Sequence, residues 1–427
     1  MKCRQIICCW CLGLNSAGKP WREDAQLIAL VGIAHFVSHF CQLLLPPLFP
    51  WLKDTFHVGY AQLGFLATIF FTASCTVQAV SGFWVDRFGP RPILFIGLGL
   101  LCLATFGYSI STSYWMMASF AAVAGVGNGV FHPVDYTLLN KKISAPRLGH
   151  AYSTHGITGT LGWALAPVLL VPLTLAYGWR VALMVAGGLA LAVLVVLIPQ
   201  REHFALAGSA RKLEVGVAVG TRDGFGGGLR GSLDFLRIPA VWMCFWFFLL
   251  YAVVLGVIQA FAPNAAGQLH GVPYALSAIC LTAYMLSSAG GMVLGGFLAS
   301  DPARCERVVG AAFSVAMVLA LILGLGHVVP LMVPILFGVM GCASGIASPS
   351  RDLLVKKSTP ENSTGRVYGV VYSGLDIGQA IAPLFFGVLM DHHQYQSIFL
   401  GLAAVQAVLI FSAFNVRRVR RSALVLA

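Results

Sequence analysis

The sequence predicts an all-α membrane protein in which twelve transmembrane helices form two six-helix parallel repeats. Three observations support this fold class: the composition, the distribution of basic residues and an internal repeat. Of the 427 residues, 58% are hydrophobic and only 10% are charged, whereas soluble proteins keep roughly a quarter of their residues charged. Most of the surface must therefore contact something other than water, and a lipid bilayer is the obvious candidate.

Apolar runs long enough to span a membrane occur twelve times along the chain. A helix needs about 20 apolar residues to cross a hydrocarbon core of roughly 30 Å. The predicted spans are 25–50, 59–83, 93–112, 114–138, 150–176, 179–198, 239–263, 273–299, 308–327, 329–353, 366–390 and 394–415.

The basic residues support this division into spans. If the N-terminus is cytoplasmic, all of the 27 Lys and Arg residues except Lys53 and Arg180 fall on the cytoplasmic side. A missed or invented helix would scramble this positive-inside pattern. We therefore expect an integral protein of the plasma membrane, most simply a bacterial inner membrane, with both termini cytoplasmic. The net charge of +12 then reflects contact with anionic lipid, and we expect no nucleic-acid partner.

The two halves of the chain match each other at an offset of 216 residues. Twelve identities occur in 45 ungapped positions, among them Gly125 with Gly341 and Pro167 with Pro383. The offset joins spans that cross in the same direction, so the repeat is parallel. Two six-helix halves of this kind form the architecture of an alternating-access transporter, whose site lies between the halves.

The chain is therefore expected to have five segments. They are a cytoplasmic N-terminal tail (1–24), an N-terminal six-helix bundle (25–198), a cytoplasmic linker (199–238), a C-terminal six-helix bundle (239–415) and a cytoplasmic C-terminal tail (416–427). The linker carries a glycine-rich run at 224–228, which indicates flexibility.

Two patterns in the N-terminal tail resemble a metal site and a nucleotide-binding loop. Its four cysteines, at positions 3, 8, 9 and 11, have no histidine partner, which favours an unstructured tail over a metal site. The segment 13–20 has the glycine and lysine spacing of a phosphate-binding loop, but Pro20 replaces the Ser or Thr that would hold magnesium. We expect no cofactor and no metal.

The loop between the second and third spans carries a recognisable motif. It reads Gly82-Phe83-Trp84-Val85-Asp86-Arg87-Phe88-Gly89-Pro90-Arg91. This resembles the cytoplasmic loop signature of the major facilitator superfamily, Gly-x-x-x-Asp-Arg-x-Gly followed by basic residues. The resemblance implies that the loop latches the two halves in the outward-open state.

Each residue of this gate motif has a physical reason to be there. Gly82 is expected to let helices approach closely, and Gly89 to permit a tight turn. Asp86 can face a neighbouring helix N-terminus, while Arg87 and Arg91 can pair with acids or lipid phosphates.

Four further segments resemble the fosmidomycin-resistance branch of the superfamily, which exports drugs in exchange for protons. They are Ala34-His35-Phe36, Leu45-Pro46-Pro47-Leu48, Tyr60-Ala61-Gln62-Leu63-Gly64 and Phe131-His132-Pro133. The fifth span also partly resembles an antiporter signature that ends in Gly-Pro, with Ala166-Pro167 at that place.

Ionisable groups at membrane depth cost roughly 2.5–3.5 kcal/mol each, so those present usually face a partner or a water-filled cavity. In the first span, His35, His39 and Gln42 share one helix face. Because histidine changes charge near neutral pH, the two histidines are candidates for proton coupling or anion binding. The alternative is a pair of neutral histidines hydrogen-bonded within the bundle.

Two carboxylates and one arginine extend this predicted pathway. Asp376 is the deepest carboxylate, and desolvation disfavours its charged form, so it is the best single candidate for a proton relay; Gln379 shares its face. Asp135 and Arg351 occupy equivalent repeat positions nearer the cytoplasmic mouth. They either form an ion pair across the halves that closes the inner gate, or each pairs within its own half.

Five more polar residues complete the candidate pathway. His132 and His155 lie at similar depth in adjacent spans and could line one vestibule. Asn128, Gln259 and Tyr284 either contribute further polar contacts or act as packing contacts between helices.

The sequence thus predicts a secondary active transporter rather than an enzyme. The first hypothesis is proton-coupled efflux of a small organic solute or drug by alternating access. The second is proton-coupled uptake of a small organic acid, favoured by Arg351 and the histidines as anion partners. The third is a transport-inactive receptor or scaffold. The expected partners are a small-molecule substrate, protons and the lipid bilayer, and the chain is expected to be a monomer.

Overall fold

The computed structural model describes residues 21–206, 239–298, 305–358 and 364–425. Within these ranges every regular element is a helix, which confirms the predicted all-α class. The first half contains α1 (Trp21–Gln42), η2 (Pro46–Leu48), α2 (Phe49–Phe56), α3 (Tyr60–Phe88), α4 (Pro90–Ile110), α5 (Tyr114–Asn128), α6 (Phe131–Lys142), η3 (Ala145–Arg147), α7 (Leu148–Tyr177), α8 (Trp179–Leu197) and η4 (Arg201–Phe204).

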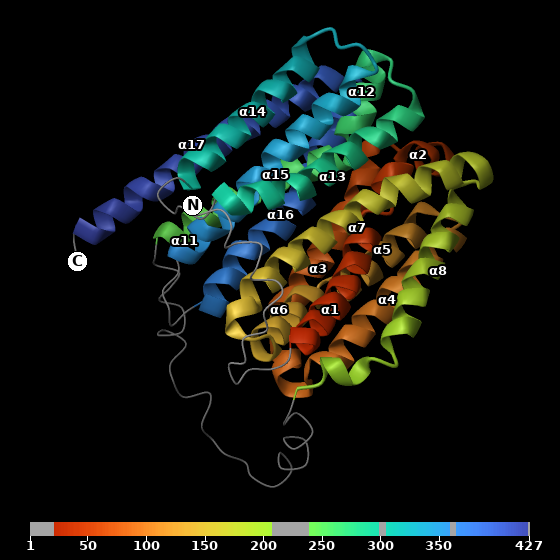
Figure 1. Cartoon of the computed structure of the whole chain (residues 1–427). Helices are drawn as coiled ribbons and strands as arrows, with labels where there is room; N and C mark the ends of the chain where they lie inside the picture. The colour runs from red at the N-terminus through yellow and green to blue at the C-terminus, as the bar shows by residue number, and fades with distance from the viewer. Residues whose placement is uncertain (1–20, 207–238, 299–304, 359–363, 426–427) are drawn as a thin grey trace, which may run out of the picture.

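The second half contains α11 (Pro239–Ala260), α12 (Ala262–His270), α13 (Tyr274–Leu298), α14 (Cys305–Leu325), α15 (Met332–Ser358), α16 (Thr364–Asp391) and α17 (Tyr395–Val425). Figure 1 shows α1–α8, coloured red to yellow-green, as one group of helices, and α11–α17, coloured green to blue, as a second group beside it.

Eleven helical segments of the described chain are long and apolar enough to cross a bilayer. The remaining predicted span, 114–138, is divided into α5 and α6, which have 15 and 12 residues. The break lies at Gly129 and Val130, directly after Asn128 and shortly before Pro133, residues that favour a turn or the start of a new helix. Together α5 and α6 supply the twelfth crossing.

The repeat in the sequence corresponds to a repeated helix crossing. A Cβ atom built on Gly125 of α5 would overlap the backbone carbonyl of Phe70 on α3. A Cβ atom on Gly341 of α15 would overlap the carbonyl of Tyr284 on α13 in the same way. Small residues allow backbones to approach this closely inside a membrane. The matching glycines therefore fix the same crossing in each half.

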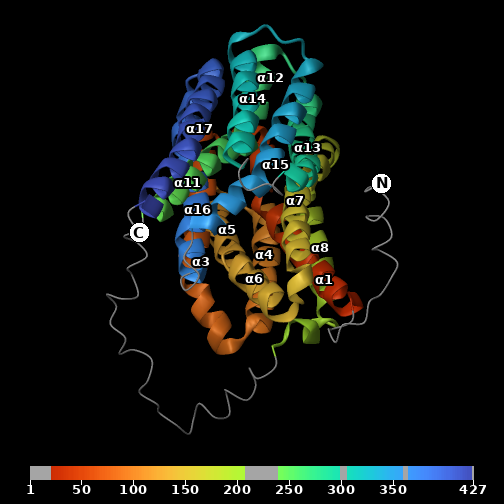
Figure 2. The same ribbon diagram turned by 60° about the vertical axis from the view of Figure 1, so that its left-hand side comes forward.

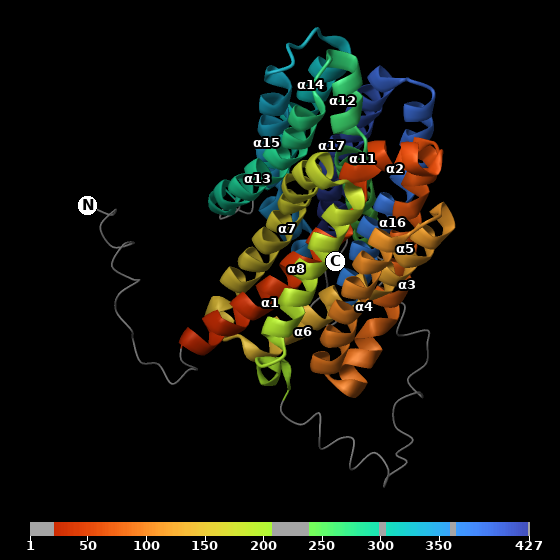
Figure 3. The same ribbon diagram turned by 90° about the vertical axis from the view of Figure 1, so that its right-hand side faces the viewer.

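The two halves meet mainly through two helix pairs, α3 with α16 and α7 with α13. Both pairs lie side by side in the turned views of Figures 2 and 3. The Thr68 hydroxyl on α3 donates a hydrogen bond to the carbonyl of Ala380 on α16, at 2.6 Å. The interface is thus held by polar contacts as well as by packing.

One end of the α3–α16 pair is closed by a carboxylate. Asp391, the last residue of α16, accepts hydrogen bonds from the backbone N–H groups of Tyr60 at 2.6 Å and Ala61 at 2.9 Å. These are the first N–H groups of α3, which have no partner within their own helix, and the positive end of the helix dipole favours a carboxylate there. We call this contact the Asp391 cap.

The boundaries of the predicted segments differ in detail from the structure. Helix α1 begins at Trp21, inside the predicted N-terminal tail, and α17 continues to Val425 through most of the predicted C-terminal tail. Residues 1–20, with the four tail cysteines, and 207–238 of the predicted linker lie outside the described residues.

Candidate functional site

Four histidines and one carboxylate of the first half meet in one place, which we call the histidine cluster. It consists of His35 and His39 from α1, His132 and Asp135 from α6, and His155 from α7. The rings of His35 and His155 are stacked with centroids 3.5 Å apart, and the His39 and His132 centroids lie 4.2 and 5.4 Å from that of His35. The sequence predicts two separate histidine pairs, and the structure joins them.

A glycine makes room for these rings. Gly159 lies on the face of α7 that packs against α1. A Cβ atom at this position would lie 2.8 Å from Nε2 of His35 and 2.8 Å from Nδ1 of His39. The absence of a side chain therefore allows two imidazoles to occupy the space between the helices.

Asp135 is the only carboxylate of the cluster and is completely buried. Its Oδ2 lies 3.0 Å from Nε2 of His155, in hydrogen-bonding geometry, and 3.1 Å from Nδ1 of His35. The contact with His35 is short but is not aligned as a hydrogen bond, since His35 Nδ1 has no hydrogen-bond partner among the described residues. A charge buried this deeply is tolerated only when it is paired.

Several polar atoms of the cluster have no hydrogen-bond partner in the described part of the chain. They are Oδ1 of Asp135 and Nδ1 of His35, His39 and His132. A buried polar atom left without a partner costs about 1–3 kcal/mol. One carboxylate therefore does not satisfy four imidazoles, and the cluster has unused donor and acceptor capacity.

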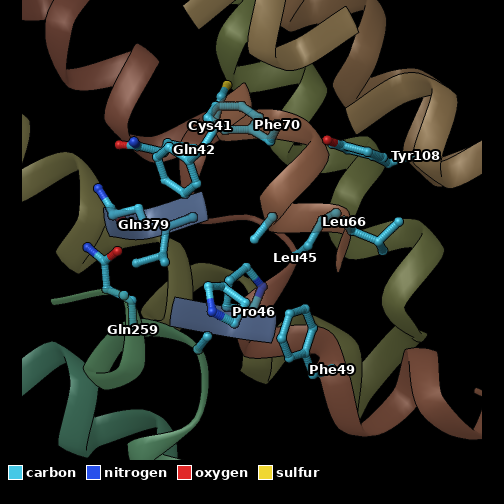
Figure 4. Close-up of a pocket in the computed structure, with 16 residues that line it drawn as sticks. Cys41, Gln42, Leu45, Pro46, Phe49, Leu66, Phe70, Tyr108, Gln259 and Gln379 are labelled. Atoms are coloured by element: carbon cyan, nitrogen blue, oxygen red, sulfur yellow. The ribbon is translucent and has the colours of Figure 1, made fainter. Parts of the chain in front are cut away.

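A separate pocket lies between the two halves (Figure 4). Three glutamines line it, Gln42 from α1, Gln259 from α11 and Gln379 from α16, and Figure 4 shows them on one side of the pocket. Its other walls are largely apolar and include Leu66 and Phe70 of α3. We call it the interface pocket.

The interface pocket is small in this conformation. Its cavity volume is about 30 Å³, which is room for roughly two water molecules. Gln42 accepts a hydrogen bond from the indole N–H of Trp163 at 2.7 Å. Nε2 of Gln259 and Oε1 of Gln379 have no partner within the described chain. One donor and one acceptor are thus left for a polar solute, which needs the halves to move apart before it can enter.

Asp376 lies on α16 one turn before Gln379, and its side chain is buried. Its carboxylate accepts a hydrogen bond from the side-chain amide of Gln78 on α3, at 3.1 Å. The predicted deepest acid therefore contacts the opposite half of the molecule. Sequence reasoning missed Gln78, although a glutamine inside an apolar span was an available signal.

Two of the predicted polar residues act as packing contacts. The Asn128 amide donates to the Ser74 hydroxyl at 3.0 Å, and the Tyr284 hydroxyl donates to the Ser344 hydroxyl at 2.9 Å. Each bond joins helices of the same half. These contacts favour the packing interpretation for Asn128 and Tyr284, whereas Gln259 lines the interface pocket.

Asp135 and Arg351 each contact their own half in this structure. Asp135 belongs to the histidine cluster, while the guanidinium of Arg351 lies over the rings of Phe248 and Tyr251 on α11, at 4.9 and 4.5 Å from their centroids. The carboxylate of Asp135 thus pairs within its own half in this conformation, and the ion pair with Arg351 across the halves stays a prediction.

The gate motif lies at the opposite end of α3 from the Asp391 cap. Gly89 has a φ of 82° and makes the expected tight turn, and Arg91 forms an ion pair with Glu202 at 2.9 Å. Asp86 is 76% exposed and lies 3.9 Å from the Lys141 ammonium, rather than against a helix N-terminus.

The expectation for Gly82 is not met in this conformation. A Cβ atom there would meet nothing within 4 Å, so no close helix approach occurs at this glycine. The guanidinium of Arg87 lies 5.2 Å from the ring of its neighbour Phe88. Exposed ion pairs such as those of Asp86 and Arg91 contribute about 0–1 kcal/mol, so the gate motif does not hold the halves together here.

The Asp391 cap was not foreseen from the sequence. Asp391 follows an apolar span directly, as ordinary loop residues do, and its partners Tyr60 and Ala61 are more than 300 positions away. No local pattern connects the two segments.

The family model for the Major Facilitator Superfamily matches residues 31–329 and 303–425 of this chain. The chain belongs to the Major Facilitator Superfamily. It is therefore an integral membrane protein of a transporter superfamily.

Two curated proteins are similar to parts of this chain. The fosmidomycin resistance protein of Escherichia coli (strain K12) is 28% identical over 162 residues, 37% of this chain and 38% of that protein. The membrane sensor protein UhpC of the same organism is 25% identical over 294 residues, 66% of each. The matched part thus spans well under half of the first relative.

A solved structure shares the superfamily fold over nearly the whole chain. The bacterial homolog of the human lysosomal transporter Spinster, in an inward-facing and unoccupied conformation, is 14% identical with a TM-score of 0.75. The similarity covers 94% of this chain and 98% of that one. At this identity it supports the fold alone.

Proposed function

We propose that this superfamily member is a proton-coupled exporter of a small organic solute or drug in a bacterial plasma membrane. The observation that carries the proposal is the hydrogen bond between Gln78 and Asp376. It joins an acid to the opposite half of the molecule, one turn from a glutamine of the interface pocket. A proton on Asp376 and a solute in the pocket would thus act on the same movement of the halves.

The charge of Asp376 sets the strength of this link. A carboxylate accepts a stronger hydrogen bond than a neutral acid, roughly twice as strong. Protonation of Asp376 therefore weakens the bond to Gln78 and eases separation of α3 from α16. Because proton and solute shift one equilibrium, each changes the affinity for the other, and their movements become coupled.

The positions of the two ends agree with alternating access. If the termini are cytoplasmic, the Asp391 cap lies on the outer side and the exposed gate motif on the inner side. This arrangement corresponds to an inward-facing state, in which the latch is open. The latch would assemble when the inner side closes and the Asp391 cap breaks.

The first experiment uses wild-type protein in vesicles of both orientations, with and without an imposed pH gradient. Fosmidomycin, which gives the E. coli relative its name, is the first solute to test, followed by a panel of small organic acids. Accumulation in inverted vesicles that requires an acidic interior supports proton-coupled export. Accumulation only in right-side-out vesicles indicates the second hypothesis, proton-coupled uptake.

A transport-inactive receptor is the alternative that one relative favours, since UhpC carries the name of a membrane sensor protein and matches 66% of this chain. Binding of a solute without transport in either vesicle orientation would select this alternative over both transport hypotheses.

A further inference from the structure

The histidine cluster has the composition of a metal site. One ring nitrogen from each of His35, His132 and His155 lies within 4.8 Å of the other two. The three residues come from three helices, α1, α6 and α7, so their meeting is a property of the fold and not of a local sequence motif. Neutral imidazole is a preferred ligand of Zn²⁺ and of neighbouring divalent transition metals.

We propose that the histidine cluster binds one divalent transition-metal ion of the Zn²⁺ class through His35, His132 and His155. Bonds from such an ion to imidazole nitrogen are about 2.0–2.1 Å long, which places the nitrogens of a tetrahedral site roughly 3.4 Å apart. The donor atoms within 4.8 Å of one another reach this spacing by ring rotations and shifts of about 1 Å.

Asp135 has the position of a supporting residue for such a site. Ligand histidines usually donate their second ring N–H to a carboxylate, which fixes the tautomer and turns the other nitrogen toward the metal. Oδ2 of Asp135 lies 3.0 Å from a ring nitrogen of His155 and 3.1 Å from one of His35. The remaining nitrogen of His155 would then point its lone pair at the ion, and a rotation of the His35 ring that aligns its contact with Asp135 would do the same for His35.

The unpartnered polar atoms are an independent argument for a cation. Oδ1 of the completely buried Asp135 has no hydrogen-bond partner in the described segments, and neither has Nδ1 of His132. A divalent ion supplies the positive charge that the buried carboxylate lacks and accepts the lone pair that the His132 ring would otherwise leave unused. Water or a neutral solute would leave the carboxylate charge uncompensated.

An anion fits the cluster less well. Binding an anion would require positive charge on several imidazoles, yet His35 and His155 are stacked with centroids only 3.5 Å apart. Two like charges at this distance repel strongly in a buried site. Neutral rings stack without this penalty, and neutral rings are the form that binds a metal.

The ion would be resident rather than transported. All of its ligands belong to the first half, on α1, α6 and α7, whereas transported substrates bind between the two halves. His132 and His39 are partly exposed while His35 and His155 are buried, which gives the ion a way in from the side of His132. The inference is independent of the solute that the interface pocket accepts.

The test uses the purified full chain in detergent after removal of metals by a chelator. Zn²⁺ alone is titrated by calorimetry, and Co²⁺ is added as a spectroscopic probe of imidazole coordination. We expect one ion per wild-type chain. His132→Ala and His155→Ala should each weaken Zn²⁺ binding at least about 100-fold, and Asp135→Asn about 10–100-fold.

His150→Ala is the matched control, because His150 is an exposed histidine near the start of the same helix as His155. It should bind Zn²⁺ as wild type does. If His155→Ala does not fold, the test uses His132→Gln instead, because His132 is partly exposed.

Two results would overturn the proposal. One is that wild type binds Zn²⁺ no more tightly than a surface histidine does. The other is that wild type and His132→Ala bind Zn²⁺ equally well. A thermal stabilisation by inorganic phosphate that His132→Ala abolishes and that Zn²⁺ does not produce would also overturn it. None of these measurements needs a transported solute, so they fail or succeed separately from the transport proposal.

Discussion

The two halves of the molecule place different chemistry on equivalent backbone positions. Asp135 and Arg351 are 216 residues apart, and so are the residues that they contact, His35 on α1 and Tyr251 on α11. In the first half a carboxylate lies 3.1 Å from an imidazole. In the second half a guanidinium lies 4.5 Å from the centre of an aromatic ring, a favourable cation–π arrangement.

The same offset separates Asp376 from Thr160, whose hydroxyl donates to the Gly156 carbonyl of its own helix at 3.0 Å. Asp376 instead bonds to Gln78 of the other half. The two halves therefore share the same helix crossings, but the side chains at equivalent positions between the helices differ. The first half holds a self-contained polar cluster, and the second half supplies an acid to the interface.

The largest expected loss of stability follows substitution of the glycines at the helix crossings that both halves share. Gly125→Ala and Gly341→Ala each force a Cβ atom into a backbone carbonyl, which cannot move as a side chain can. Each should destabilise the protein by about 3 kcal/mol. Thermal unfolding in detergent, followed by the fraction that stays monodisperse, measures this, with Gly99→Ala as a control at an open position. A large loss from one substitution and none from the other would show that the crossings are not equivalent.

The next largest loss of stability is expected in the histidine cluster of the first half. Gly159→Ala places a Cβ atom 2.8 Å from two histidine rings, and because side chains can shift, we expect a destabilisation of about 1–2 kcal/mol. The Zn²⁺ affinity should fall with it. Gly156→Ala, one turn away on α7 with nothing within 4 Å, should change neither quantity. Unchanged stability and Zn²⁺ binding in Gly159→Ala would contradict the packing described for the cluster.

A smaller effect is expected at the Asp391 cap. Asp391→Asn removes the charge that faces the start of α3, which is worth about 1 kcal/mol, or roughly a fivefold shift between conformations. Cys41, buried in the wall of the interface pocket, should then react faster with a maleimide. Mass spectrometry of the labelled peptide measures the rate, and Asp54→Asn, which alters an exposed acid of α2, is the control. Equal labelling rates would mean that the cap does not hold this end closed.

The smallest effect on stability is expected at the gate motif. Asp86 is 76% exposed and 3.9 Å from Lys141, so Asp86→Asn should change the free energy of unfolding by less than about 1 kcal/mol. Transport should nevertheless fall sharply if the motif latches the halves in another state. Wild-type transport by Asp86→Asn would reject the role that the superfamily resemblance implies.

The sequence could predict the membrane spans and the faces of single helices, because both depend on the pattern of residues along one helix. Apolar runs located the spans, and the i, i+4, i+7 spacing placed His35, His39 and Gln42 on one face, which contacts His155 and Trp163 of α7. Periodicity defines the faces of a helix but not which helix lies against each face. It could therefore not place Asp135 beside His35, a contact between residues 100 positions apart.

Contacts between residues far apart in the chain could not be predicted from the sequence. Gln78 and Asp376 are 298 positions apart, and neither carries a local sign of the other. The break between α5 and α6 follows Asn128-Gly129, a turn-favouring pair, and precedes Pro133, so the sequence carried a local sign of it that counting apolar residues overlooked.

The most direct test of the account compares proton-driven accumulation with solute exchange in Asp376→Asn. Removing the titratable group while keeping a hydrogen-bonding side chain should abolish accumulation driven by a pH gradient and leave exchange, which needs no net proton movement, largely intact. Asp54→Asn should retain both activities. If Asp376→Asn still builds a solute gradient from a pH gradient at the wild-type rate, Asp376 is a structural residue and the proposed coupling across the halves is wrong.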